Sequence, residues 1–174
     1  SESEELKWSQ MSDDARNKQV QAAHSASRGR RVPLAQKIAT AQSNQWNPIS
    51  SEYELLLRQW LTERSIESIP QLAVGPYNCD VAAAPVAVEV FGGGWNGGSR
   101  NPIRLEERIR YFLNSGWHLL MVAVDSRRSP LTPAVADYVA AYIQQASSNP
   151  SARREYRVIW RAGEVSVSGY ADDA

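Results

Sequence analysis

The sequence predicts an α/β protein with a mixed central sheet flanked by helices. Two features lead to this class: amphipathic stretches with helical spacing alternate with short apolar runs, and the chain ends in a hairpin pattern. The expected order is helix, strand, strand, helix, strand, helix and hairpin, with no internal repeat. A basic, polar segment with helical character precedes these elements.

The first half of the expected domain contains one helix and two strands. Ser51 begins the helix, whose buried face follows the spacing of one helical stripe: Tyr53, Leu56, Leu57, Trp60 and Leu61. Pro70 ends the connection that follows. Two strands are expected at Tyr77–Ala82 and Val86–Phe91, and the glycine-rich run 92–98 predicts a loop.

The second half alternates helices with strands. Gly116 ends one helix, and Thr132 with Pro133 forms the N-cap and first turn of the next. Between them, a continuous apolar run is typical of a strand buried on both faces. The expected elements are Ile103–Ser115, His118–Val124, Thr132–Ala146, Tyr156–Trp160 and Val165–Ser168.

Length and composition indicate one domain with an appendage. The chain has 174 residues, and residues 1–47 lack the pattern of a packed core, so we expect an arm at 1–47 and a domain at 48–174. The single cysteine excludes a disulfide scaffold and a multi-cysteine zinc site. No apolar run approaches the roughly 18 residues of a membrane-spanning helix, and the N-terminus does not resemble a signal peptide. We therefore expect a cytoplasmic protein, in a phage or bacterial context, without a membrane partner.

The arm carries an excess of positive charge that the overall balance of 19 Lys plus Arg against 19 Asp plus Glu conceals. Six cationic residues and no acid lie between Ala15 and Asn47. Such an excess attracts a phosphate backbone without sequence preference, so these residues are candidates for DNA binding. A solvated, partly disordered basic arm is the alternative. The six residues are Arg16, Lys18, Arg28, Arg30, Arg31 and Lys37.

Two carboxylates interrupt apolar strands and indicate a metal site. Asp80 and Glu89 lie in consecutive strands, and a hairpin can bring them side by side. Buried carboxylates without partners are costly, so a pair of them usually holds a cation or a proton. Oxygen ligands with retained waters suit Mg²⁺, which can ionise a water and stabilise charge on a phosphoryl group. The alternative is that one or both carboxylates point to solvent on an edge strand.

Two further residues have two interpretations each. Glu54 follows Ser51 at the spacing of a capping box, but it also lies one residue from the buried helix face, where it could assist catalysis. Trp95 stands in the glycine-rich loop, where its indole could stack on or wedge between bases, or plug the edge of the core. This loop does not match the phosphate-binding pattern of nucleotide sites.

Several segments match a known family in order and spacing over residues 48–125. They are Glu54-Leu-Leu-Leu-Arg-Gln-Trp-Leu, Pro70-Gln-Leu-Ala-Val-Gly-Pro-Tyr-Asn-Cys-Asp80, Val88-Glu-Val-Phe-Gly-Gly-Gly-Trp-Asn96, the pair Arg104 and Arg108, and Gly116-Trp-His-Leu-Leu-Met-Val. In these segments the chain resembles the very short patch repair endonuclease-like group of the PD-(D/E)XK nuclease superfamily. That group includes phage and intron homing endonucleases with a Glu-Asp-x-His-Asp site. The segment Arg28-Gly-Arg-Arg-Val-Pro-Leu-Ala-Gln-Lys-Ile-Ala also resembles the modular DNA-binding motif attached to homing endonucleases.

The resemblance implies a restriction-endonuclease-like fold and hydrolysis of phosphodiester bonds in double-stranded DNA with Mg²⁺ or Mn²⁺. By position, Asp80 would bind the metal and Glu54 would be the acidic residue of the first helix, which favours its functional interpretation. Glu89 would fill the acidic position of the second strand. In the repair branch a main-chain carbonyl meets the metal there instead, and in this chain it would belong to Val90.

Asn96 departs from the family pattern because it stands at the position of the catalytic histidine. An asparagine can hydrogen-bond but cannot take a proton near neutral pH. Phe91 and Leu105 also stand where relatives carry polar or acidic residues. The site is therefore either weakened or inactivated, natively or by an engineered change, or it uses a water activated by the metal alone.

The sequence thus predicts a metal-dependent DNA endonuclease of homing type. Arg104 and Arg108, one helical turn apart, would face the scissile phosphate or its neighbours. The alternative is a catalytically inactive DNA-binding protein on the same fold, and a third class is an interaction module without nucleic acid. The target sequence, the cut geometry and the oligomeric state are not predicted. The expected catalytic residues are Glu54, Asp80, Glu89 and Asn96.

Overall fold

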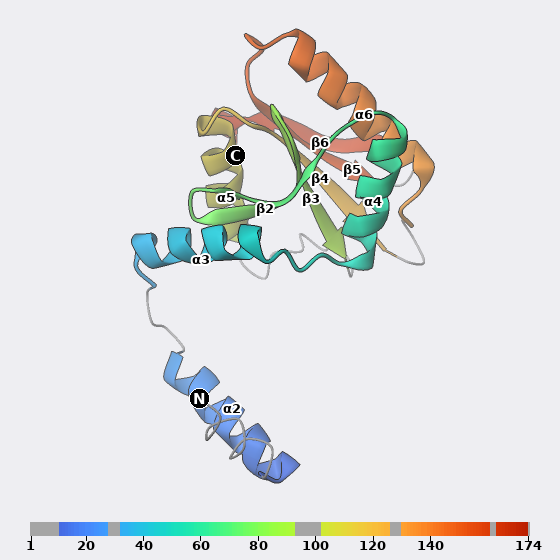
Figure 1. The fold of residues 1–174 in the computed structure, drawn as a ribbon. Helices are drawn as coiled ribbons and strands as arrows, with labels where there is room; N and C mark the ends of the chain where they lie inside the picture. Colours follow the sequence, from blue (N-terminus) through green and yellow to red (C-terminus); the bar gives the residue numbers. More distant parts are fainter. Residues whose placement is uncertain (1–10, 28–31, 93–101, 126–129, 161–162, 174) are drawn as a thin grey trace. The chain divides into compact units, whose positions relative to one another are not determined.

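The computed structural model describes residues 11–27, 32–92, 102–125, 130–160 and 163–173. By internal contacts the chain divides into two units, residues 1–33 and residues 34–174. In the first unit, helix α2 spans Asp13–Ser27 (Figure 1). Its first turn carries Asp13 and Asp14, which suit the positive end of the helix dipole.

Within the described ranges, the second unit contains a six-stranded mixed sheet whose strands lie in their sequence order. β3, β4 and β5 run parallel, whereas β1–β2, β2–β3 and β5–β6 pair antiparallel. β4 lies between two parallel neighbours and is buried along its whole length, as its apolar run predicts. The strands are β1 Ile69–Val74, β2 Tyr77–Ala83, β3 Val86–Gly92, β4 His118–Val124, β5 Glu155–Trp160 and β6 Glu164–Tyr170.

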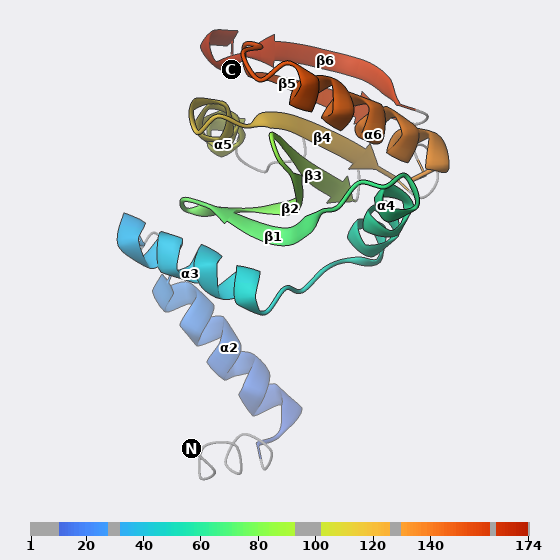
Figure 2. The same ribbon diagram turned by 45° about the horizontal axis from the view of Figure 1, so that its top comes forward.

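Helices cover both faces of this sheet (Figure 2). α4 (Glu52–Glu63) and α6 (Pro133–Ser148) pack on one face, and α5 (Pro102–Asn114) packs on the other. A short turn of 3-10 helix, η1 (Ala171–Asp173), follows β6. The predicted fold class, a mixed sheet flanked by helices, is confirmed. None of the described helices is long and apolar enough to cross a membrane.

β1 occupies a segment in which the sequence predicts only a connection. Pro70 lies inside this strand and pairs with Val81 of β2, rather than ending a loop. β1 is an edge of the described sheet, where a strand can tolerate a residue without an N–H group. Gln71 follows with a φ of +48°, which interrupts the extended backbone. Because Pro70 and Gln71 interrupt the alternation of apolar and polar residues, the sequence pattern does not predict this strand.

Helix α3 (Leu34–Trp46) belongs to the second unit, although the sequence assigns residues 1–47 to the arm. Ala41 is 2% exposed, and its carbonyl accepts a hydrogen bond from Asn78 Nδ2 at 2.7 Å. Gln45 Oε1 accepts a hydrogen bond from the N–H of Ala73 at 2.9 Å. Asn44 Nδ2 also donates to Asn78 Oδ1 at 3.2 Å. One small apolar residue and three hydrogen bonds thus attach α3 to β1 and β2, so no broad apolar stripe marks this helix. The structural boundary after residue 33 lies one helix before the predicted one.

Candidate active site

The predicted carboxylate site lies where β2 and β3 stop pairing. Residues 81–83 of β2 pair with residues 86–88 of β3. One step beyond the last pair, the half-buried Asp80 directs its carboxylate toward β3, and Oδ2 accepts a hydrogen bond from the N–H of Val90 at 2.8 Å. The side chain of Asp80 thus takes the role that a main-chain carbonyl has in a regular ladder.

Gln71 connects Asp80 to Glu54. The flanking pairs of β1 and β2 place Gln71 opposite Asp80. Its amide nitrogen, Nε2, donates to Asp80 Oδ1 at 3.2 Å and to Glu54 Oε2 at 3.1 Å. The structure thereby brings two of the predicted catalytic carboxylates together through one amide group.

Glu54 contacts the N-cap of α4 and also faces Asp80. Ser51 is the N-cap of α4, and its Oγ accepts a hydrogen bond from the N–H of Glu54 at 3.4 Å. The same hydroxyl donates to Glu54 Oε1 at 2.7 Å, so the carboxylate contacts the Ser51 side chain. Glu54 is 9% exposed and uses its other oxygen toward Gln71. The cap therefore fixes the orientation of the carboxylate that faces Asp80.

Glu89 pairs with Arg108 on the α5 face of the sheet. It is 4% exposed, and its Oε1 accepts a charged hydrogen bond from Arg108 Nη2. The same nitrogen donates to the main-chain carbonyl of Asn78, and the guanidinium lies 5.4 Å from the centre of the Tyr77 ring. Arg108 therefore points into the protein toward Glu89, whereas the sequence predicts that it faces a phosphate.

The three carboxylates create an excess of negative charge in a poorly solvated site. Burial raises the pKa of the Asp80 carboxyl, and the Glu54 carboxylate raises it further against the opposing hydrogen bond from Val90. Burial likewise raises the pKa of Glu89 to about 8, although the Arg108 guanidinium opposes this change. One guanidinium cannot balance three ionised carboxylates, so the site favours the uptake of a proton or a cation.

The donor set decides which ion could bind there. Among the residues that the structure describes, no three His, Cys, Asp or Glu side chains gather closely enough to hold a metal by themselves. Glu54 and Asp80, however, converge on a single amide group and present oxygen atoms only. Mg²⁺ binds through one or two carboxylates and keeps several waters, so these residues fit Mg²⁺ or the similar Mn²⁺.

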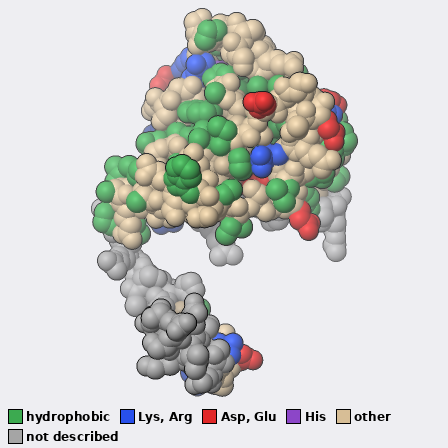
Figure 3. All heavy atoms as spheres, viewed as in Figure 1, with side chains coloured by type: hydrophobic (Ala, Val, Ile, Leu, Met, Phe, Trp, Pro, Cys, Tyr) green, Lys and Arg blue, Asp and Glu red, His purple; other side chains and the backbone are tan. Residues whose placement is uncertain are grey.

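The predicted DNA-binding residues are spread over several elements. On α2, Arg16 lies 3.7 Å from Asp13 and Lys18 lies 2.9 Å from Asp14, because two acids directly precede the basic stretch. Lys37 on α3 and Arg104 on α5 are exposed. On the face shown in Figure 3, described Lys and Arg side chains are dispersed among apolar and uncharged groups. The remaining predicted site residues lie outside the described ranges: Arg28, Arg30, Arg31, Trp95 and Asn96.

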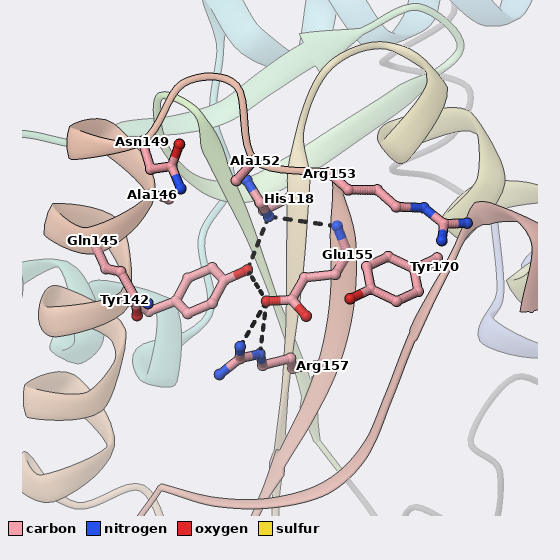
Figure 4. Close-up of a pocket in the computed structure, with 10 residues that line it drawn as sticks. All are labelled: His118, Tyr142, Gln145, Ala146, Asn149, Ala152, Arg153, Glu155, Arg157 and Tyr170. Carbon is pink, nitrogen blue, oxygen red and sulfur yellow. Dashed lines mark hydrogen bonds and ion pairs between the residues drawn. The ribbon is translucent and has the colours of Figure 1, made fainter.

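A cavity of about 310 Å³ lies at the opposite, amino-terminal end of the parallel strands (Figure 4). His118 begins β4, Glu155 begins β5, and Tyr142 projects from α6 between them. The Tyr142 hydroxyl lies 2.9 Å from both Glu155 Oε1 and His118 Nδ1, and Arg157 Nη2 donates to Glu155 Oε1 at 2.6 Å. These polar groups satisfy one another, which is typical of a structural network.

The hydrogen bonds of His118 indicate its protonation state. Arg154 can only donate, and its Nη1 lies 2.9 Å from His118 Nε2, so Nε2 acts as an acceptor. In a neutral ring the proton is then assigned to Nδ1, which donates to the Tyr142 oxygen, whose own proton goes to Glu155. In this tautomer the 3.4 Å contact between the Glu155 N–H and Nδ1 is not a hydrogen bond. Burial lowers the pKa of His118, and Arg154 lowers it further against the opposing effect of Glu155. A neutral histidine therefore belongs to the folded state.

Sequence reasoning does not identify Gln71 or Asn78 as parts of the site. Asn78 Nδ2 donates to the main-chain carbonyl of Gln71 at 2.8 Å and thereby supports the residue that bridges the carboxylates. Neither amide stands out by composition. The available signal is positional, because recognising β1 as a strand would place Gln71 beside Asp80.

Comparisons with known proteins give one structural similarity. No protein-family model matches the chain, and no curated protein matches it. The catalytic domain of the homing endonuclease I-Bth0305I is similar with a TM-score of 0.37 and 17% sequence identity, over 57% of this chain and 93% of that domain.

Proposed function

We propose that the chain is a metal-dependent endonuclease of homing type that hydrolyses phosphodiester bonds in double-stranded DNA. The observation that carries this proposal is the convergence of Glu54 and Asp80 on one amide, beside the buried Glu89. Glu54 and Asp80 would hold Mg²⁺ or Mn²⁺. The Glu89 carboxylate and the Val90 carbonyl are the two candidates for a further ligand.

The protein groups around the carboxylates keep them oriented for this role. Ser51 and Gln71 hold the two oxygens of Glu54, while Gln71 and the Val90 N–H hold those of Asp80. An ion bound there would supply a more acidic water and stabilise charge on the phosphoryl oxygens. Asn96, at the family histidine position, can orient a water by hydrogen bonding but cannot accept its proton, which supports a weakened activity.

Contacts with the DNA backbone are proposed for the cationic residues that the sequence identifies. Lys37 is exposed on α3, which packs against β1 and β2, and Arg104 is exposed on α5, which covers one face of the sheet. Arg16 and Lys18 would have to exchange their Asp13 and Asp14 partners for phosphates. Further contacts are proposed for Arg28, Arg30, Arg31 and Trp95.

The alternative, a DNA-binding protein without hydrolytic activity, is favoured by one observation in particular. The guanidinium of Arg108 already neutralises Glu89, which reduces the charge available for a metal. Asn96 and Phe91 in place of the family residues point in the same direction. The two functions differ in their response to a divalent ion.

Plasmid and linear duplex DNA, incubated with the purified full chain in Mg²⁺, Mn²⁺ or chelator, separate these functions. We expect cleavage that requires the divalent ion and that Asp80→Asn reduces by more than the roughly 10- to 100-fold that the loss of a residue supporting a metal ligand costs. Asp137→Asn is the matched control, because Asp137 of α6 is an exposed acid that pairs with Arg64. A salt-sensitive mobility shift without cleavage supports the alternative, and the absence of both effects supports an interaction module without nucleic acid.

A further inference from the structure

Gln71 has a backbone conformation that glutamine rarely adopts. Its φ of +48° lies in the left-handed region, where residues with a side chain are disfavoured. Such a conformation persists where the surrounding structure enforces it, and it often occurs at functional sites. The main-chain carbonyl of Gln71 is held by Asn78 Nδ2, and strand pairs lie on both sides of it.

This conformation serves a specific contact. One side-chain NH₂ group has two protons, and Gln71 gives one to Glu54 and the other to Asp80. Two carboxylates would otherwise repel each other, as the effect of Glu54 on the pKa of Asp80 shows. The amide therefore sets the separation of the two groups without adding charge.

We propose that Gln71 is the positioning residue of the carboxylate site, holding Glu54 and Asp80 at the separation that a divalent ion requires; this inference rests on the proposed metal-dependent function. The four carboxylate oxygens each receive one hydrogen bond: Ser51 and Gln71 serve Glu54, and Gln71 and Val90 serve Asp80. A carboxylate oxygen has a second lone pair, so the amide and an ion can bind the same oxygens. Gln71 thus orients the ligands and does not occupy the place of the ion.

The support of Gln71 extends to two helices. Asn78 Nδ2 also donates to the Ala41 carbonyl of α3, and the Asn78 carbonyl accepts from Arg108 of α5. Asn78 of β2 therefore contacts the left-handed residue of β1 as well as α3 and α5. Because these contacts fix the main chain, a substitution at 71 can remove the amide while the strand stays in place.

The test compares full-length chains with substitutions at this position. Gln71→Gly removes the amide and suits the left-handed backbone, and Gln71→Asn keeps an amide that is one methylene too short to reach both carboxylates. Gln59→Ala is the matched control, because Gln59 Nε2 also donates to a carboxylate, Glu63 Oε1 at 3.2 Å, on the exposed face of α4. Circular dichroism checks folding, calorimetry measures Mn²⁺ affinity, and cleavage of duplex DNA is resolved into kcat and KM.

We expect Gln71→Gly and Gln71→Asn to lower Mn²⁺ affinity or kcat by about 10- to 100-fold, with KM for DNA unchanged and Gln59→Ala equal to wild type. If one of the two variants fails to fold, the other decides. Wild-type Mn²⁺ affinity and kcat in a folded Gln71 variant overturn the inference and leave the nuclease function intact. A wild-type chain that neither binds Mn²⁺ nor cuts DNA overturns the proposed function, and the role of Gln71 falls with it.

Discussion

A single arginine pairs with a buried carboxylate of the candidate site. Arg108 of α5 pairs with the buried Glu89 of the candidate site. Its guanidinium also lies over the Tyr77 and Phe112 rings, which stabilise a cation through their π-faces. A buried ion pair adds little net stability over apolar packing, but removing one partner leaves an unpaired buried charge.

Above about pH 8, where Glu89 is ionised, Arg108→Met should therefore lower the free energy of unfolding by about 3–5 kcal/mol, since the buried carboxylate loses its partner. The double variant Arg108→Met with Glu89→Gln should recover a large part of this loss, because the buried group is then neutral. Urea unfolding followed by circular dichroism measures both.

Arg110→Met on the same helix is the control for the loss of an arginine side chain. Arg110 pairs with Glu106 at the surface, where an ion pair contributes about 0–1 kcal/mol. Equal destabilisation by Arg108→Met and Arg110→Met would show that Glu89 does not depend on Arg108.

At the scale of elements, periodic segments are predictable and irregular ones are not. The apolar runs that become β3 and β4 and the amphipathic stripes that become α4 and α5 are visible in the sequence. β1 is not, because Pro70 and the left-handed Gln71 break its pattern. Carboxylates inside apolar strands indicate the site at Asp80 and Glu89. Gln71, which orients Asp80, cannot be predicted from the sequence, because its role depends on recognising β1 as a strand.

The docking of α3 gives a prediction about truncation. A chain that begins at Leu34 should retain the stability of the second unit, whereas a chain that begins at Pro48 should lose it in part. Loss of α3 exposes the Ala73 N–H and the Asn78 amide to water and removes the hydrogen bonds that they make with this helix, each worth about 0.5–1.5 kcal/mol. Urea unfolding of the two truncated chains measures the difference, and equal free energies would contradict the role of α3.

At the scale of the whole second unit, the two ends of the parallel strands have different chemistry. The carboxylates gather where β3 ends, the kind of location at which open α/β sheets bind ligands. The network of His118, Tyr142 and Glu155 lies where β4 and β5 begin. The sequence marks the first end through charged residues in apolar strands, whereas the second joins residues from three separate segments and has no sequence signature.

This network should make stability depend on pH. Tyr142 of α6 and Arg154, Glu155 and Arg157 of the β5 region face His118, whose pKa is lowered in the folded state by burial. Below its ordinary pKa of about 6.5, the unfolded chain binds a proton that the folded chain does not. The stabilising contribution is thus complete above about pH 6.5 and is lost as the pH falls.

His118→Gln removes this titration and isolates its effect from that of the carboxylates. Between pH 7.5 and 5.5, the free energy of unfolding of the wild type should fall relative to that of His118→Gln. Urea unfolding of both proteins at the two pH values measures this difference, and parallel pH profiles would contradict it.

The contact between Asp80 and Val90 also limits the length of a strand. Val90 has a single N–H, which can serve either the main chain of β2 or the carboxylate of Asp80. As long as an acid stands at position 80, the hairpin of β2 and β3 cannot close by one more step through that group. An apolar residue at position 80 would remove this competitor, so the Val90 N–H could then bond to the main chain of β2 and extend the ladder. The carboxylate that belongs to the candidate site is therefore also the group that stops the pairing of β2 with β3.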